Sequence, residues 1–359
     1  MPVSKRDTSE GFRPKVRLSE DIVRPANDIL RLDGLIETKL LSSQLHQSIL
    51  GMTRLRNAVS SLRMEGEVVE LDRARMVLDG TVQSASAAEE GFLRLARAYS
   101  NLSHGSLPEI SVDGVVRKHK ELFGGILGSD VAGELKNKQN YIVTGVGETV
   151  RFIPTPPERV LPELHALFDW YHSNRFGFPP VISAALFFAE FQAIHPFVDG
   201  NGRLGRYLNV AVLLDLGCLR ASVIPLDLCF FRSSEHYYDM LGTTNTGIDY
   251  NLWCRYFVGE VRKAYRIAVR QANLSPVVSR FSRESTRSIL RWVLSGDGNW
   301  FSRSDYPNKR RYSNPTLWSS LDELVQGGIL EARGERRGRL YRLRSQFLAE
   351  IYRQKFGDR

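Results

Sequence analysis

Residues 183–206, SAALFFAEFQAIHPFVDGNGRLGR, decide the fold of the central part of the chain. The first twelve of them are apolar on nearly every side, which predicts a helix that is buried almost all round. The last twelve combine a His, an Asp, an Asn, three Gly and two Arg, and packing demands alone do not explain such a mixture. The stretch therefore predicts a core helix that ends in a loop with a chemical role.

Three residues of this loop are suited to bind an anion. Gly200, Asn201 and Gly202 can adopt backbone conformations that other residues avoid, so their N–H groups can converge on one point. An apolar periodicity begins at Leu204 and predicts a second helix directly after them. We therefore expect an anion-binding nest at the start of a helix.

The charged residues around the nest favour a nucleotide as the anion. Arg203 and Arg206 are three positions apart, so both lie on one helix face and can grip further phosphate oxygens. A structural ion pair is the alternative role for Arg203. Asp199 supplies a hard oxygen ligand for Mg²⁺, although Asp also often caps a helix. His195 can accept a proton near neutral pH, so the group predicts transfer of part of a nucleotide to a hydroxyl.

The twelve residues HPFVDGNGRLGR resemble the signature of the Fic family, HPFx(D/E)GNGRxxR, at every specified position. The similarity extends over roughly residues 110–265, with weaker similarity back to about residue 30. It implies a mainly α-helical Fic-type domain with a β-hairpin flap. It also implies a protein adenylyltransferase that uses ATP and Mg²⁺, transfers AMP to a Ser, Thr or Tyr hydroxyl of a target protein or of itself, and releases pyrophosphate.

The resemblance gives each motif residue a role by its position. His195 is the expected general base and catalytic residue, and Asp199 the metal ligand. Asn201 and Gly202 would cradle the α-phosphate, and Arg206 would clamp the γ-phosphate. Two tyrosines and an asparagine downstream would wall the adenine pocket, although the tyrosines also suit core packing. The full set expected to bind ATP is Glu65, Asp199, Gly200, Asn201, Gly202, Arg203, Leu204, Gly205, Arg206, Tyr237, Tyr238 and Asn245.

A second part of the resemblance is the flap. Residues 140–154 contain two short β-branched runs around residues 145–148, the pattern of a β-hairpin that prolines end. Its exposed strand edge would pair with the target segment and hold the hydroxyl in line; the residues expected to do so are Thr149, Val150, Arg151 and Phe152. Residues 133–136, GELK, depart from the family, whose members usually have Arg in the last position.

An inhibitory motif precedes the catalytic one. Ser61 and Glu65-Gly66 match the family pattern (S/T)xxxE(G/N), at the place typical of members with an N-terminal inhibitory helix. A bidentate pair between the Glu65 carboxylate and Arg206 would occupy the charge meant for the γ-phosphate. In some relatives the same glutamate helps to remove AMP, so de-AMPylation stays open. An ordinary solvated helix glutamate is the alternative, because other acidic residues follow closely.

The length of 359 residues favours two or three domains. We expect a flexible arm at residues 1–20, an N-terminal helical region with the inhibitory helix at 21–105, and the Fic domain at 106–275. Residues 276–359 pattern as two helices followed by a hairpin at 329–343, which predicts a winged-helix-like domain. Arginines gather in this hairpin between residues 333 and 344. They suit either a wing that contacts DNA or a solvated hairpin that packs on protein.

Composition limits the setting of the protein. The chain has 42% hydrophobic residues and a net charge of +9, which is ordinary for a globular protein and favours anionic partners. It has three cysteines without metal or disulfide spacing, no apolar signal segment and no run long enough to span a membrane. We expect a cytoplasmic protein without membrane contact, and homodimers are common among its relatives.

Two other functions compete with AMP transfer. One is a DNA-binding regulator whose Fic-like unit senses nucleotide with little transferase activity; the retained His195 argues against it, because sensing needs no base. The other is an enzyme that moves UMP, phosphocholine or a phosphoryl group instead of AMP. The GNGR loop and Asp199 suit a nucleoside triphosphate, which favours AMP.

Overall fold

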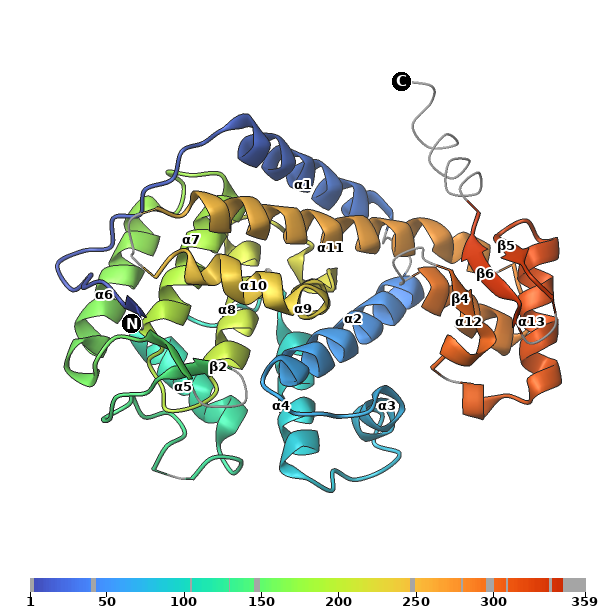
Figure 1. Ribbon diagram of the computed structural model, residues 1–359, viewed down its shortest axis with the longest axis horizontal. Helices are drawn as coiled ribbons and strands as arrows, with labels where there is room; N and C mark the ends of the chain where they lie inside the picture. The colour runs from blue at the N-terminus through green and yellow to red at the C-terminus, as the bar shows by residue number, and fades with distance from the viewer. Residues whose placement is uncertain are drawn as a thin grey trace. The chain divides into compact units, whose positions relative to one another are not determined.

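The computed structural model describes residues 3–39, 43–103, 105–128, 130–144, 149–245, 249–278, 280–294, 300–307, 309–335 and 338–344 (Figure 1). The chain divides into two compact units. Unit 1 consists of Met1–Glu37 and Leu50–Arg266, and unit 2 of Thr38–Ile49 and Ile267–Arg359. The boundary predicted near residue 105 separates no compact bodies, because helices on both sides of it pack together. The C-terminal part of unit 2 begins at Ile267 rather than at residue 276, where the C-terminal domain was predicted to begin.

The core of unit 1 is a pair of consecutive helices, α7 (Pro180–Ile194) and α8 (Asn201–Asp215). Every residue of α7 after the first is buried, which confirms the prediction of a core helix. Three helices pack against the pair: α4 (Ala87–Asn101), α5 (Val112–Phe123) and α6 (Pro157–Asn174). The long helix α11 (Asn251–Val278) adds Trp253, whose ring lies 5.8 Å from that of Phe188 and whose Nε1 donates to the Ala185 carbonyl at 2.8 Å.

Further helices lie wholly or largely in the rest of unit 1. They are α1 (Glu20–Lys39), α2 (Ser43–Met64), α3 (Leu71–Leu78), η1 (Ala221–Val223), α9 (Leu226–Arg232) and α10 (Ser234–Gly242). The predicted inhibitory motif lies at the end of helix α2, and the buried side-chain amide of Asn57 fixes the position of this helix. Asn57 donates to the Ile224 carbonyl at 3.1 Å and accepts from the Asp227 amide at 3.2 Å. Because both bonds are buried, α2 cannot shift without leaving polar groups unpaired.

A small sheet forms the flap region of unit 1. Strands β2 (Ile142–Thr144) and β3 (Thr149–Ile153) pair antiparallel, which confirms the predicted hairpin; residues 145–148 of its turn lie outside the described residues. A third strand, β1 (Val3–Ser4), pairs in parallel with β3 at Phe152 and Ile153, so β3 is the central strand. One edge of β3 was expected to be exposed for target docking. At the C-terminal end of β3, β1 covers an edge of the strand.

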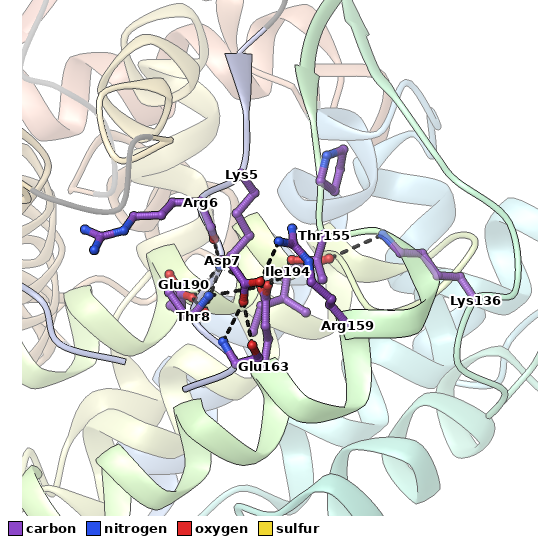
Figure 2. A network of polar contacts seen from close by, with 12 residues as sticks. Lys5, Arg6, Asp7, Thr8, Lys136, Thr155, Arg159, Glu163, Glu190 and Ile194 are labelled. Carbon is purple, nitrogen blue, oxygen red and sulfur yellow. Dashed lines mark hydrogen bonds and ion pairs between the residues drawn. The ribbon is translucent and has the colours of Figure 1, made fainter. Parts of the chain in front are cut away.

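The prediction of a flexible arm at residues 1–20 is corrected by the contacts of this N-terminal segment. The ammonium of Lys5 is buried between two buried carboxylates, 2.8 Å from Glu163 Oε2 on α6 and 2.7 Å from Glu190 Oε1 on α7 (Figure 2). Thr8 donates to Glu190 Oε1 at 2.7 Å, and the ring of Phe12 is buried. The charged composition of this segment predicts a loose arm. The structure differs because the buried carboxylates of Glu163 and Glu190 require polar partners, which Lys5 and Thr8 supply.

Unit 2 has a core of its own. Its described elements after α11 are α12 (Glu284–Leu294), β4 (Phe301–Ser302), η2 (Arg303–Asp305), η3 (Lys309–Arg311), α13 (Asn314–Gln326), β5 (Leu330–Arg333) and β6 (Leu340–Leu343). The three strands form an antiparallel sheet in the order β4-β6-β5. Side chains from both helices and the sheet, including Leu290, Leu324 and Tyr341, make one buried cluster.

No helix in the described part of the chain is both long enough and apolar enough to cross a bilayer.

Candidate active site

His195 occupies a special backbone position at the end of α7. It caps the helix with φ 52° and ψ 63°, and among the described non-glycine residues it alone has a positive φ. Such a conformation costs energy and marks sites where a side chain must be aimed. Its Nδ1 lies 3.3 Å from the Gln192 carbonyl, which assigns the proton to Nδ1 and leaves Nε2 as the basic nitrogen. Burial, together with the nearby Lys136 ammonium, lowers the pKa of His195 to about 4, so the ring is neutral at pH 7.

Lys136 holds the loop that follows α7. Its Nζ donates to Asn140 Oδ1 at 2.7 Å and to the Ile194 carbonyl at 3.3 Å, and its backbone N–H donates to the Pro196 carbonyl at 2.9 Å. Burial lowers the pKa of Lys136 to about 8, while Glu163 opposes this effect. In sequence this residue stands out only as a departure from the family pattern. The structure places it against the end of α7, beside His195.

Asn201 and His119 shape the rest of the loop. The Asn201 amide spans the turn, accepting from the Phe197 N–H at 2.9 Å and donating to the Phe197 carbonyl at 2.8 Å. His119 on α5 accepts from the Gly133 N–H at Nδ1, so its Nε2 carries the proton and donates to the Asp199 carbonyl at 2.9 Å. No local sequence signal marks His119, because its partners lie far along the chain.

The three glycines of the motif allow close approach at the start of α8. Gly200 has φ +80°, and a Cβ there would lie 2.6 Å from the Phe123 ring. A Cβ at Gly202 would lie 2.1 Å from Glu65 Oε1, and one at Gly205 would lie 2.3 Å from Gln192 Nε2. Only glycine fits these positions without displacing a neighbour.

Arg206 is buried and already bound to the end of α2. Its Nε donates to Ser61 Oγ at 2.8 Å, and its Nη2 donates to the Ser61 carbonyl at 2.9 Å and to Glu65 Oε1 at 2.6 Å. Burial opposes the charge most strongly, but the Glu65 carboxylate together with Tyr237, Asp227 and Tyr238 outweighs this effect, so the pKa of Arg206 is raised. The contact between Glu65 and Arg206 is thus present. Only Nη2 of the guanidinium donates to Glu65, whereas a bidentate pair would use two nitrogens. The neighbouring Nε donates to Ser61 Oγ instead.

Arg203 makes a second connection to the segment after α2. Its Nη1 donates to Glu67 Oε1 at 2.5 Å, and its Nη2 donates to Asp199 Oδ1 at 3.1 Å. The guanidinium also lies over the Phe123 ring, 4.8 Å from its centroid. These contacts match the alternative role of Arg203, which is a structural ion pair. Glu67 was not singled out in the sequence, although it lies two residues after Glu65.

These elements enclose one cavity of about 600 Å³, a size typical of small-molecule sites. Among the residues expected to bind ATP, those that line it are Glu65, Asp199, Gly200, Asn201, Gly202, Arg206, Tyr237, Tyr238 and Asn245, together with His195. The lining described does not include Ser61, Arg203, Leu204 or Gly205; Leu204 is fully buried in α8. Tyr237 is buried beside Tyr238, whose hydroxyl donates to the Met64 carbonyl at 3.0 Å.

The flap contributes mainly its β2 side to this cavity. Tyr141, Ile142 and Val143 line it, and of the residues expected to dock a target only Phe152 does so. Val150 pairs with Val143 across the hairpin. The side chains of Thr149 and Arg151 lie outside the described residues.

Asp199 is the candidate metal ligand at the cavity rim. Its side chain is 53% exposed, and both of its hydrogen bonds, from Gly200 N–H and Arg203, reach Oδ1. The part of the chain described has no cluster of three or more metal-binding side chains. A single open carboxylate beside a phosphate site fits Mg²⁺, which binds through one or two carboxylates, phosphates and water.

Comparisons with known proteins identify similar chains. Residues 109–213 match the model of the Fic/DOC family. Protein adenylyltransferase fic-1 of Caenorhabditis briggsae is 31% identical over 140 residues, which cover 39% of this chain and 25% of that protein. The Caenorhabditis elegans protein of the same name is 28% identical over 195 residues, or 52% of this chain and 36% of that one. The chain thus matches no more than about a third of these relatives' length.

A solved structure shares the fold over most of the chain. It is a Fic family protein from Desulfovibrio desulfuricans G20, with a TM-score of 0.63 and 21% identity, and the match covers 93% of this chain and 99% of that one.

Proposed function

Because residues 109–213 match the model of the Fic/DOC family, we propose that this chain is an autoinhibited protein adenylyltransferase. It would transfer AMP from ATP to a Ser, Thr or Tyr hydroxyl of a target protein or of itself. One observation carries the proposal: neutral His195 lines the same cavity as Gly200 and Gly202 at the start of α8. A base and an anion-binding backbone in one cavity suit attack of a hydroxyl on a phosphate.

The chemistry follows from these positions. His195 Nε2 takes the proton of the target hydroxyl as its oxygen attacks the α-phosphate. The new O–P bond forms as the bond from the α-phosphorus to the bridging oxygen breaks, and pyrophosphate leaves with that oxygen. The N–H groups at the start of α8 stabilise the charge that develops on the α-phosphate oxygens. Mg²⁺, when bound at Asp199, would offset the charge of the leaving phosphates.

Autoinhibition rests on the occupied state of Arg206. Its Nε and Nη2 already donate to Ser61 and Glu65, so a γ-phosphate finds only part of the guanidinium available. The Tyr238 hydroxyl also ties Met64, at the end of α2, to the expected adenine side of the cavity. A γ-phosphate on Arg206 would therefore have to displace a charge-assisted bond before it aligned for transfer.

The test uses the full chain with Mg²⁺ and ATP labelled at the α- or the γ-phosphate. The proteins are wild type, Glu65→Gly and the double variant Glu65→Gly/His195→Ala, and Glu70→Gly is the matched control because Glu70 is exposed and lies outside the cavity. We expect α-label on protein at least tenfold above wild type with Glu65→Gly, and none above background with the double variant. Glu70→Gly should behave as wild type.

Two other results would contradict the proposal, and a third would extend it. Transfer of γ-label would identify phosphoryl transfer. Saturable ATP binding without label on any protein would favour the nucleotide-sensing regulator. Loss of α-label from Glu65→Gly protein after addition of wild type, with release of AMP, would assign de-AMPylation to Glu65.

A further inference from the structure

Unit 2 concentrates the positive charge of the chain. Residues 280–344 contain fourteen Lys and Arg against seven Asp and Glu, so this stretch carries +7 of the net +9 in less than a fifth of the length. Such a local excess of cations is the electrostatic footprint of an anionic partner.

One set of these cations is used within the unit. Arg342 pairs with Glu331 at 2.6 Å, and Arg339 pairs with Asp322 at 2.9 Å. The guanidinium groups of Arg333 and Arg342 both lie over the Trp300 ring, at 4.3 and 4.7 Å from its centroid. The carboxylates of Glu331 on β5 and Asp322 on α13 are thereby neutralised, which removes two charges that would repel an anion.

A second set is exposed and differently placed. Lys309, Arg310 and Arg311 make up the whole of η3, and all three are exposed. Within the described residues none of them pairs with a carboxylate at 4 Å or less; the Lys309 ammonium donates to the Ser304 carbonyl. Only Tyr312 separates them from Ser313, which caps α13 by accepting from the Thr316 N–H at 3.3 Å. Three cations therefore lead into a helix whose first residue, Asn314, is exposed.

The described surface of unit 2 is unsuited to an apolar partner. The exposed large apolar side chains, such as Val68, Phe176 and Leu252, all belong to unit 1. Every large apolar side chain that the structure describes in unit 2 is buried or partly buried, most of them in or against the core of the unit. A polar, cationic surface without exposed apolar anchors favours a polyanion over a protein.

The order of the elements agrees with this choice. Helix α12, strand β4, helix α13 and the hairpin β5–β6 with β6 in the centre of the sheet follow one another as in winged-helix modules. In helix-turn-helix proteins the second helix enters the major groove with its N-terminal residues at the base edges, and other residues, among them Lys and Arg, contact the phosphates. We propose that residues 280–344 bind duplex DNA, with Lys309, Arg310 and Arg311 on the phosphates and Asn314 on α13 facing the base edges.

Salt dependence measures the phosphate contacts. Three contacts contribute a slope of about −2.7 to log K against log salt, so they alone weaken binding about 40-fold between 50 and 200 mM salt. The probe is a fluorescent 24-base-pair duplex of random sequence, bound to the full chain and followed by anisotropy. No nucleotide is present, so the result is independent of AMP transfer.

The variant K309A/R310A/R311A tests the surface. It should weaken binding at least tenfold at 100 mM salt and make the slope shallower by about 3. The matched control is R24A/R31A/R75A, which removes the same charge from exposed positions of unit 1 and should change affinity less than twofold.

Three results would overturn the proposal. They are equal losses in the two triple variants, a slope unchanged by K309A/R310A/R311A, and no duplex binding at 50 mM salt and 100 μM protein. The last result would assign the surface to a protein partner instead. Both triple variants replace exposed side chains, and unchanged unfolding temperatures will verify that they fold.

Discussion

The cations of the two units differ in what they already hold. Arg203 and Arg206 of unit 1 are buried, and each is bound to a carboxylate from the segment that follows α2. Arg310 and Arg311 of unit 2 are exposed, and neither pairs with a carboxylate within the described residues. A buried cation requires its partner, and an incoming phosphate must displace that partner, whereas an exposed cation binds an anion subject only to salt. The first kind suits regulation and the second suits docking.

Removal of a buried cation should have the largest effect on stability. Lys5→Met leaves Glu163 and Glu190 buried beside an uncharged side chain (Figure 2), which we expect to cost about 3–5 kcal/mol of the free energy of unfolding. Thermal unfolding should then begin about 10 °C lower. Lys15→Met, an exposed lysine of the same segment, is the control and should shift the transition by less than about 1 °C. Equal shifts in the two variants would show that the N-terminal segment is not docked.

The pH profile of transfer tests the buried base. Burial and Lys136 lower the pKa of His195 to about 4, so the ring is a competent base above that pH and loses activity as it gains a proton below it. In the Glu65→Gly background we expect a flat rate between pH 5.5 and 7.5 and a fall towards pH 4.

A substitution of Lys136 sharpens this test. Lys136→Met removes the neighbouring positive charge and should move the acid limb of the profile to higher pH. Lys138→Met is the control, because Lys138 is exposed. An acid limb that stays in place would contradict the assigned effect of the Lys136 ammonium on the pKa of His195.

Glu67 should have a smaller effect than Glu65. Glu67→Gln weakens the hold on Arg203 but leaves Arg206 bound, so we expect AMP incorporation to rise about two- to fivefold, less than with Glu65→Gly. Initial rates with α-labelled ATP measure it, and Glu70→Gln serves as the control. A rise that equals that of Glu65→Gly would place the brake on Arg203 instead.

The exposed cations of unit 2 should have the smallest effect on the fold. Because they form no ion pair with a carboxylate in the described region, K309A/R310A/R311A should change the free energy of unfolding by less than about 0.5 kcal/mol. Urea unfolding of the full chain measures it. A larger loss would mean that these side chains serve the core of unit 2 rather than a partner.

Local patterns predicted the centre of the site. The buried helix, the glycine nest and the motif around His195 depend on residues close together in sequence, and apolar periodicity and conformational freedom express such features directly. The flap hairpin and the partnership of Glu65 with Arg206 also follow from short motifs. Ser61 belongs to the same motif, but it accepts two hydrogen bonds from Arg206. The guanidinium is therefore shared between Ser61 and Glu65 instead of forming a bidentate pair with Glu65.

Contacts between segments that lie far apart in the chain could not be predicted from the sequence. His119, Lys136 and Glu67 act through partners that only the packed fold brings near. The charge of residues 1–20 predicts a loose arm. An acidic residue within an apolar helix, Glu190, nevertheless indicates that a cation from another segment pairs with it, and that cation is Lys5. Composition records which residues are charged, but not which charges are buried together.

In the proposed function Glu65 occupies Arg206 until autoinhibition is relieved. The direct measurement is calorimetric binding of ATP and of ADP with Mg²⁺ to wild type and to Glu65→Gly, because the two nucleotides differ by the γ-phosphate alone. We expect wild type to bind ATP and ADP with nearly equal affinity. Glu65→Gly should bind ATP about 10- to 100-fold more tightly than ADP, because Arg206 is then free to form a charge-assisted bond with the γ-phosphate. The same ratio in both proteins would contradict this role of Glu65.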